Sequence, residues 1–438
     1  MKIILLIILV ISISLKASYI IEDEFKEKVY VRTYGNSSHE PIILVHGMGN
    51  EASSLYEDVI DNLKDDYFVL TFDLPGFGKS TKSNQLYSMN RYVKFIHNVK
   101  NKYIHKKYHL LGHSMGGAIS LKYASTYQNE IKSLIIVDAA GILTKQSFAQ
   151  AIIKNNINNI LGDNAKKYRL DVAISKIPSF LEELIPIDMG KIIKNSKARE
   201  YIFKSNPSVI SALSLVDQDY SSVIKKITLN TRIIWGKDDS IATIKTAYAL
   251  NKLITHSKLN IIDDSKHIPF IDNYDEFMKI LKDHLKYPYY KIQPKPIYSK
   301  RKSIIWENVN NRTISGDINY LELNNCQNIT IKNARIKEFQ IFQSRVKLIN
   351  SEFKPSYISY FVNSIIEMIS SSINNKYPIE VYNSDMEFVA VDFKSRTYIF
   401  KNLNPLLSTK IQISLSNKNG NSLHAEYHLR KNSSKLYK

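Results

Sequence analysis

Ser114 is the residue of this chain whose surroundings most directly suggest chemistry. It lies between glycines in the stretch "LLGHSMGGAIS", after an apolar, strand-like run and before a helix-like one. Small residues on either side of a serine let a strand turn sharply into a helix, which exposes the hydroxyl at the turn. A hydroxyl becomes a strong nucleophile only when a base takes its proton and a carboxylate orients that base. The pattern therefore predicts a nucleophile, with an ordinary tight turn as the alternative.

Two later segments supply a carboxylate and a base. The stretch "WGKDDSI" offers Asp238 and Asp239 at the end of one apolar run, and "DDSKHIPF" offers His267 at the end of the next. The carboxyl ends of parallel strands meet at one edge of a sheet, where ligands gather. The order serine, acid, histidine along the chain predicts that these side chains meet at that edge.

Apolar segments that alternate with helix-like ones must position these residues. Strands that are apolar throughout and alternate with helices indicate a mostly parallel sheet covered on both faces, in a doubly wound α/β domain. The segments expected to hold strands are 29–35, 41–47, 67–80, 108–114, 133–140, 231–239 and 258–267. The stretch 141–226 interrupts this alternation with amphipathic, helix-like pieces, which predicts a helical cap inserted over a pocket.

Five motifs together resemble the α/β-hydrolase superfamily. They are "LVHGMG", "FDLPGFGKS", "LLGHSMGG", "WGKDDSI" and "KHIPF", and the likeness covers residues ~25 to 285. Within that superfamily, "GHSMGG" resembles lipases and carboxylesterases more than peptidases. The resemblance implies an α/β-hydrolase fold with a helical cap, and a serine hydrolase that forms an acyl-enzyme.

The resemblance also implies a role for each matching residue. Ser114 matches the nucleophile, His267 matches the base, and Asp239 matches the acid, with Asp238 as the fallback. The backbone N–H groups of Met48, in "HGMG", and of Met115 match the oxyanion hole, which stabilises the developing negative charge. His46, His113 and Asp73 are expected to be structural.

The expected substrates are small-molecule or lipid carboxylic esters. An acyltransferase or an amidase would use the same three side chains with another acceptor or leaving group. A protein that acts mainly by binding a surface through its C-terminal part is the non-enzymatic alternative. The proton relay is complete without a metal or a cofactor, so none is expected.

The pattern changes after residue 286. A proline-containing linker is expected at 287–310, and the hydrolase domain at 19–286. In 311–438, four segments that begin at 326, 343, 363 and 383 carry apolar residues at their fourth, sixth and eleventh positions. A period near 20 predicts one short group of strands per coil of a β-solenoid, similar to parallel β-helices, with an antiparallel β-sandwich as the alternative.

Charge and the first residues bear on location. The formal net charge is +19, and residues 291–438 hold 22 Lys and Arg against 11 Asp and Glu. This excess predicts either contact with an anionic cell envelope or only a lysine-rich composition, and no nucleic-acid signature is present.

The apolar run from Ile3 to Leu15 predicts a signal peptide over 1–18, or an uncleaved anchor, and hence export to the periplasm, surface or medium of a bacterium. Cys326 is the single cysteine, which excludes an internal disulfide.

Overall fold

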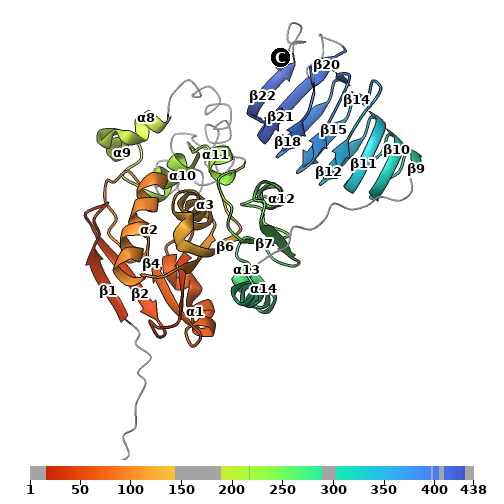
Figure 1. Ribbon diagram of the computed structural model, residues 1–438. Coiled ribbons are helices and arrows are strands. Elements are labelled where there is room, and N and C mark those ends of the chain that lie inside the picture. Colours follow the sequence, from red (N-terminus) through yellow and green to blue (C-terminus); the bar gives the residue numbers. More distant parts are fainter. Residues whose placement is uncertain are drawn as a thin grey trace, which may run out of the picture. The chain divides into compact units, whose positions relative to one another are not determined.

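The computed structural model of the protein describes residues 16–143, 189–216, 218–288, 302–395, 398–403 and 409–429 (Figure 1). The chain divides into two compact units. The first comprises residues 1–219, 227–242 and 260–289, and the second comprises 220–226, 243–259 and 290–438. Most of the predicted signal peptide, residues 144–188 of the predicted cap and residues 289–301 of the predicted linker lie outside the described residues.

An eight-stranded sheet carries the N-terminal fold, in the order β1-β2-β4-β3-β5-β6-β7-β8. Strands β1 and β2 pair antiparallel with each other, as do β2 and β4, whereas the recorded pairs from β4 through β3, β5 and β6 to β7 are parallel. The strands are β1 (Lys16–Ile21), β2 (Lys28–Tyr34), β3 (Glu40–Val45), β4 (Tyr67–Phe72), β5 (Tyr108–His113), β6 (Ile131–Val137), β7 (Thr231–Gly236) and β8 (Ser257–Ile262).

The centre of this sheet is covered on both faces. Every residue of β5 and of β7 is buried, as expected for parallel strands with helices above and below them. Helix α14 is amphipathic and packs Phe277 and Leu281 into the core cluster that contains Leu44, Leu111 and Ile234. The predicted mostly parallel α/β sheet is therefore confirmed.

Helices connect these strands along the chain. They are η1 (Ala52–Tyr56), α1 (Glu57–Leu63), α2 (Met89–Tyr103), α3 (Met115–Tyr127), η2 (Gln128–Glu130), α8 (Met189–Lys194), α9 (Ser196–Tyr201), α10 (Pro207–Val216), α11 (Tyr220–Ile224), α12 (Ile244–Leu253), α13 (Pro269–Asp272) and α14 (Tyr274–Lys286). The described part of the predicted cap insertion, from residue 189 onward, is helical and holds α8 to α11. None of the described helices is both long enough and apolar enough to cross a membrane.

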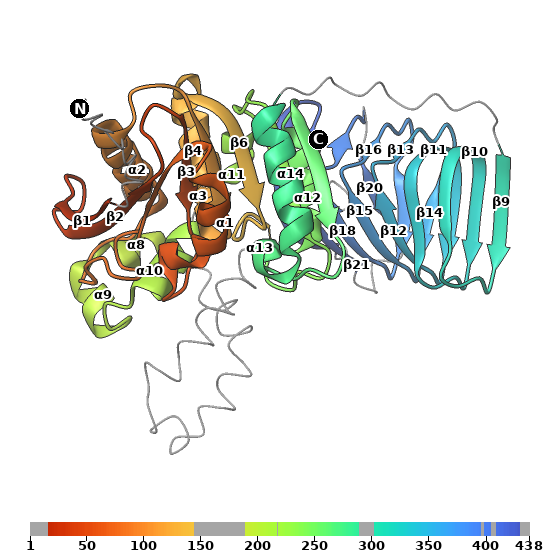
Figure 2. The ribbon, with the colours of Figure 1, turned by 90° about the horizontal axis from the view of Figure 1, so that it is seen from below.

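The C-terminal region is all-β and β-helix-like. Figure 2 shows its strands stacked side by side. The recorded pairs from β9 to β21 are parallel, which excludes the antiparallel β-sandwich. Among the described residues of this region, only β21 and β22 are recorded as an antiparallel pair. Its strands are β9 (Lys302–Glu307), β10 (Thr313–Asn324), β11 (Ile329–Phe342), β12 (Arg345–Ile349), β13 (Glu352–Phe353), β14 (Tyr360–Val362), β15 (Ile365–Ile369), β16 (Ser372–Ile373), β17 (Ile379–Tyr382), β18 (Asp385–Val389), β19 (Asp392–Phe393), β20 (Phe400–Asn402), β21 (Thr409–Lys418) and β22 (Asn421–Leu429).

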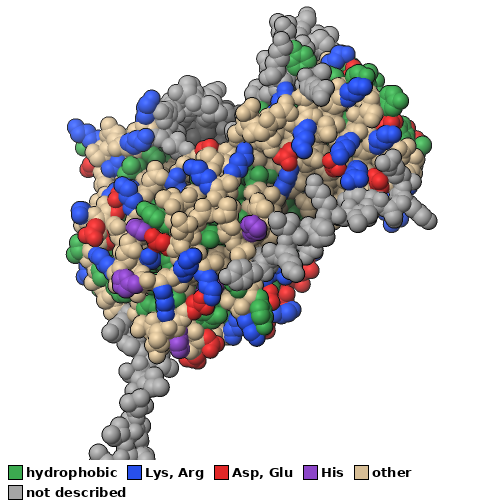
Figure 3. Space-filling view, in the orientation of Figure 1, with side chains coloured by type: hydrophobic (Ala, Val, Ile, Leu, Met, Phe, Trp, Pro, Cys, Tyr) green, Lys and Arg blue, Asp and Glu red, His purple; other side chains and the backbone are tan. Residues whose placement is uncertain are grey.

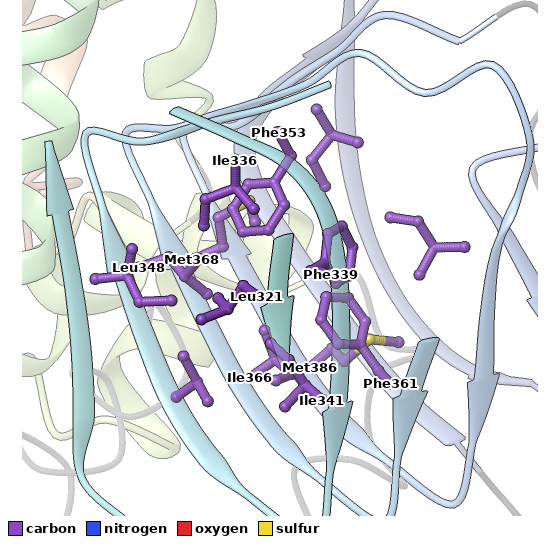
Figure 4. Close-up of a cluster of buried hydrophobic side chains, with 14 of the residues drawn as sticks. Leu321, Ile336, Phe339, Ile341, Leu348, Phe353, Phe361, Ile366, Met368 and Met386 are labelled. Atoms are coloured by element: carbon purple, nitrogen blue, oxygen red, sulfur yellow. The ribbon is translucent and has the colours of Figure 1, made fainter. Parts of the chain in front are cut away.

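Apolar residues at equivalent places in successive coils form the core of this region. Leu348 pairs with Met368 and Met368 pairs with Phe388, each step being 20 residues. Figure 4 shows Leu348 and Met368 pointing into the interior, with Phe339 and Phe353 among the other side chains that fill it. Each coil therefore buries its apolar face against the coils beside it.

Serine ladders satisfy the buried main chain at two corners of the coils. The N–H of Ser344 donates to the Ser364 hydroxyl and the N–H of Ser364 donates to the Ser384 hydroxyl, both at 3.1 Å. At another corner the N–H of Ser351 donates to the Ser371 hydroxyl at 3.0 Å. Buried main-chain donors are costly unless they are paired, so the repeated serines stabilise the turns that separate the strands.

Two strands lie inside ranges for which the sequence analysis expects no folded structure. Strand β9 at Lys302–Glu307 pairs in parallel with β10, although 287–310 is predicted as linker. Its alternating sequence "KSIIWE" buries Ile304 in the core of the C-terminal region, which explains why it joins the stack. Strand β1 begins at Lys16, within the predicted signal peptide of residues 1–18, and pairs with β2.

Candidate active site

Ser114 occupies a sharp turn between a strand and a helix. Strand β5 ends at His113 and helix α3 begins at Met115, so Ser114 alone makes the turn, with φ 54° and ψ −122°. Residues other than glycine seldom adopt a positive φ, and such strain is concentrated at functional sites. A Cβ atom on Gly116 would lie 2.2 Å from the carbonyl oxygen of Val45, so only glycine lets α3 start this close to β3. This geometry is that of a nucleophile elbow.

An unbroken chain of hydrogen bonds joins Ser114, His267 and Asp239. The Ser114 Oγ and His267 Nε2 atoms are 2.9 Å apart, and His267 Nδ1 and Asp239 Oδ2 are 2.8 Å apart. Asp239 follows β7, and His267 lies between β8 and α13. Three segments that are distant in the sequence therefore meet at the carboxyl ends of the strands, where a hydroxyl, an imidazole and a carboxylate are in line for proton transfer.

Asp239 is held as a carboxylate by its surroundings. Its Oδ1 atom accepts hydrogen bonds from the N–H groups of Ile241 at 2.7 Å and Ala242 at 2.9 Å. Burial acts to raise the pKa of Asp239, but the hydrogen bond and charge of His267 and the Ala242 N–H outweigh it, and the pKa is lowered. The fallback residue, Asp238, is exposed, and the structure does not bring it to His267.

The backbone N–H groups of Met48 and Met115 are available to a ligand. Met48 lies in the loop after β3, and Met115 is the first residue of α3. Within the described residues, neither N–H donates to a protein acceptor. A Cβ atom on Gly47 would lie 2.7 Å from the Ser114 Cβ, so the loop that carries Met48 packs directly against the elbow. Two such donors beside a nucleophile can stabilise an oxyanion.

His46 fixes the loop that carries Met48. Its Nδ1–H donates to the Gly47 carbonyl oxygen at 2.6 Å, because its Nε2 atom accepts the Leu74 N–H at 2.8 Å. Burial lowers the pKa of His46 to about 4, so the imidazole is neutral near pH 7 and can act as donor and acceptor at once. The ring thus ties the loop after β3 to the loop after β4.

Asp73 holds the glycine-rich loop that follows β4. Its Oδ1 atom accepts the Ser53 N–H at 3.0 Å, and its Oδ2 atom accepts the Lys79 N–H at 2.7 Å. A Cβ atom on Gly78 would lie 2.3 Å from the Asp73 Oδ2. The carboxylate is therefore occupied with the shape of the loop, which is a structural role.

Two further buried residues at this site have contacts that the sequence patterns did not predict. His113, expected to be structural, has its Nε2 atom 2.8 Å from the main-chain carbonyl oxygen of His267. Asp138 follows β6, is completely buried and accepts the Gly236 N–H at 3.0 Å. Its place directly after a buried strand was the one available signal. Within the described residues, no group of three or more His, Cys, Asp or Glu side chains is arranged to hold a metal ion.

Known proteins with similar sequences were found by comparison. The chain is 27% identical over 272 residues to Lipase 1 of Psychrobacter immobilis, and the alignment covers 58% of this chain and 82% of that lipase. It is 27% identical over 257 residues to Lipase 3 of Moraxella sp. (strain TA144), which covers 56% and 77%. An esterase of known structure from Exiguobacterium antarcticum is 24% identical, covering 62% of this chain and 100% of that one, with a TM-score of 0.47.

A family model also matches the chain. The model, described as alpha/beta hydrolase fold, matches residues 40–274, which is more than half of the 438 residues. The matched range contains the elbow at Ser114 together with Asp239 and His267. By this match, the chain belongs to the α/β-hydrolase fold family.

Proposed function

We propose that this protein is a serine hydrolase that cleaves carboxylic esters through Ser114, His267 and Asp239. Its lipase relatives support an enzyme of the α/β-hydrolase class. The observation that carries the finer proposal is the hydrogen-bond chain from the Ser114 hydroxyl through His267 to the Asp239 carboxylate, at 2.9 and 2.8 Å.

The mechanism follows from these three side chains and two amides. His267 Nε2 takes the proton of the Ser114 hydroxyl while Oγ attacks the carbonyl carbon of the ester. The carbonyl electron pair moves onto oxygen, where the N–H groups of Met48 and Met115 stabilise it. The carbonyl then re-forms, and the alcohol leaves with the proton from His267. Water repeats these steps on the acyl-serine, which releases the acid and restores the hydroxyl.

We favour ester hydrolysis over amide hydrolysis and over acyl transfer because the relatives are lipases. The two lipases share 27% identity with this chain over most of their own length. An amidase or an acyltransferase would use the same relay, and it would be distinguished by its products. An ester hydrolase turns amide substrates over slowly. When an alcohol is added to an ester substrate, it still forms mainly the free acid rather than a new ester.

Covalent labelling tests the proposal directly. A fluorophosphonate probe is expected to modify Ser114 in the full chain, and a panel of esters of increasing acyl length is expected to be hydrolysed. Ser114→Ala should lower kcat/KM by about 10⁴-fold or more. The matched control is Ser120→Ala, which removes a buried hydroxyl from the same helix outside the relay. Retention of most of the activity by a pure Ser114→Ala preparation contradicts the assignment.

For the C-terminal region, we propose binding to an anionic polysaccharide of the cell envelope. A groove of about 1520 Å³ runs along the corner that follows β13, β16 and β19. Its described lining contains Lys354, Lys376, Lys394 and Lys418 together with asparagines and Tyr398, and no aspartate or glutamate. On the face that Figure 3 shows, basic and acidic side chains are mixed, whereas lysines are the only charged residues in the described lining of the groove.

The spacing of this groove suits a linear anionic polymer. Phe353, Ile373 and Phe393 pair in successive coils, so Lys354 and Lys394 follow them at equivalent places two coils apart. Neighbouring coils are about 4.8 Å apart, so Lys354 and Lys394 are about 10 Å apart along the stack with Asn374 between them, and Lys354 is also paired with Glu352 at 2.8 Å. Burial lowers the pKa of Lys418, and a bound anion would favour its charged form. The lining has no large aliphatic side chain to enter a bilayer.

Binding of polygalacturonate to the full chain tests this second proposal. Changing Lys354, Lys376, Lys394 and Lys418 together to Gln should abolish binding and leave hydrolysis of a soluble ester unchanged. The control changes four exposed lysines of the same region outside the groove, Lys302, Lys332, Lys337 and Lys410, so the net charge is the same. Added salt should weaken binding, because exposed charges are screened within ~8–10 Å. An equal loss of polygalacturonate binding in the two variants would contradict the proposal that the groove is the binding site. Binding of the protein to anionic vesicles but not to polygalacturonate would also contradict it.

A further inference from the structure

Asp138 is a buried carboxyl group beside the proposed catalytic acid. It follows β6, and its residue is completely buried with φ 42°. The Gly236 N–H donates to its Oδ1 atom at 3.0 Å, which ties the end of β6 to the end of β7. No N–H or hydroxyl group of the described residues donates to its Oδ2 atom. A buried carboxylate oxygen without a donor is costly, whereas a buried carboxylic acid can itself donate a hydrogen bond.

The Asp138 and Asp239 carboxyl groups interact through their charges and through a side-chain hydrogen bond, which raises the pKa of Asp138 and lowers the pKa of Asp239. Two carboxyl groups in such contact cannot both be ionised, so one of them holds a proton. Asp239 is bonded by His267 and by the N–H groups of Ile241 and Ala242, all of which favour its charged form. Asp138 receives only the Gly236 N–H. The surrounding donors therefore place the charge on Asp239 and the proton on Asp138.

The charges around Asp138 act in the same direction. Burial raises the pKa of Asp138 well above its usual range, and the neighbouring Asp239 raises it further. Asp272, on α13, contributes more weakly in the same sense, while the Gly236 N–H opposes them. His267 lies beyond Asp239, to which its Nδ1 atom is bonded.

We propose that Asp138 is a positioning residue, a neutral carboxylic acid whose Oδ2–H donates to the Asp239 carboxylate and holds it in line with His267. The inference rests on the proposed hydrolase function, because it gives Asp239 the role of the catalytic acid. A neutral donor steadies Asp239 without adding a second negative charge. A second charge would stabilise the imidazolium of His267 and move the onset of activity to higher pH.

Two substitutions separate this role from its alternatives. Asp138→Asn keeps an acceptor for the Gly236 N–H and a donor for Asp239, so it should retain kcat/KM within about threefold. Asp138→Val has a similar shape but neither group, and it should lose about 10- to 100-fold, as expected for one hydrogen bond to a charged group. Thermal melting of both variants reports whether the loss arises from unfolding, and if Asp138→Val does not fold, the Asn variant and the wild type still decide.

The pH dependence of the rate gives the decisive comparison. The acid limb of kcat/KM, and of inactivation by the fluorophosphonate probe, should coincide in the wild type and Asp138→Asn. If Asp138 were ionised, the Asn substitution would remove a negative charge, and the limb would move to lower pH by about one unit. Such a shift, or an Asn variant as impaired as the Val variant, overturns the inference.

An infrared difference spectrum tests the proton without any turnover. At neutral pH the wild type should show the C=O stretching band of a protonated carboxylic acid that is missing in Asp138→Asn. Absence of that band overturns the inference even if the enzyme reacts normally with the probe. Conversely, a wild type that shows the band but is not labelled at Ser114 refutes the proposed hydrolase function while leaving the proton on Asp138 established.

Discussion

His113 donates a hydrogen bond from its Nε2 atom to the main-chain carbonyl oxygen of His267, with 2.8 Å between the two atoms. Burial lowers the pKa of His113 to about 3, so near pH 7 the ring is neutral and carries one proton, which this bond places on Nε2. The residue directly before the proposed nucleophile thus anchors the backbone of the proposed base. The distance between the Ser114 and His267 side chains is thereby set from both ends.

Removal of that anchor should slow catalysis more than it weakens substrate binding. We expect His113→Phe, which keeps a ring but loses the donor, to lower kcat by about five- to tenfold with little change in KM, as for the loss of one neutral hydrogen bond. His113→Gln keeps an N–H at similar reach and should recover much of the rate. Steady-state kinetics of the two variants check this, and equal losses in both would show that His113 acts only through packing.

The two neighbouring aspartates should differ strongly. Asp239→Asn removes the carboxylate that orients His267 and should lower kcat/KM by about 10⁴-fold, as in other relays of this type. Asp238→Asn changes an exposed neighbour and should have little effect. The pair is matched in charge and chemistry, so comparison of kcat/KM decides between them. The reverse ranking would move the acid to Asp238.

Acid should destabilise the fold before the carboxylates titrate. Burial lowers the pKa of His46 to about 4, of His113 to about 3 and of His284 to about 2. Below about pH 6.5 these histidines bind protons in the unfolded chain but stay neutral in the folded protein. The free energy of unfolding therefore falls with decreasing pH, by up to about 1.4 kcal/mol per pH unit for each histidine.

Denaturant unfolding between pH 7 and 5 measures this slope. His113→Gln removes one such histidine and should make the slope shallower, whereas the control His105→Gln replaces an exposed histidine and should leave the slope unchanged. A stability that is constant over this pH range would contradict the assignment of these histidines as neutral in the folded state.

Export is a prediction that the apolar run from Ile3 to Leu15 motivates. Protein isolated from its native cells should begin between Ala17 and Tyr19, as read by N-terminal mass analysis. Cleavage there would leave three to five of the six residues of β1, in which Tyr19 pairs with Tyr30. A soluble cytoplasmic protein that retains Met1 would refute export.

The sequence patterns predicted the parts of the fold that depend on local chemistry. Continuous apolar runs located β3, β5 and β7, and paired glycines located the turn at Ser114, because both follow from short-range rules. The contact of Asp138 with Asp239 depends on which strands lie side by side and on where one proton resides. The anchor from His113 to His267 joins residues 154 positions apart. Neither relationship leaves a periodic signal in the sequence.

The serine ladders of the C-terminal region have a consequence for how this region can change in length. Ser344, Ser364 and Ser384 bond to one another at intervals of 20 residues, and the apolar core repeats at the same interval. A coil from one such serine to the next presents nearly the same donors and acceptors on both sides. Duplication or deletion of one whole coil within the gene would therefore leave every remaining junction paired. A coil of another length keeps the ladder only where the extra residues lie between the corners, as in the 25 residues from Ser384, whose N–H donates to the Thr409 hydroxyl.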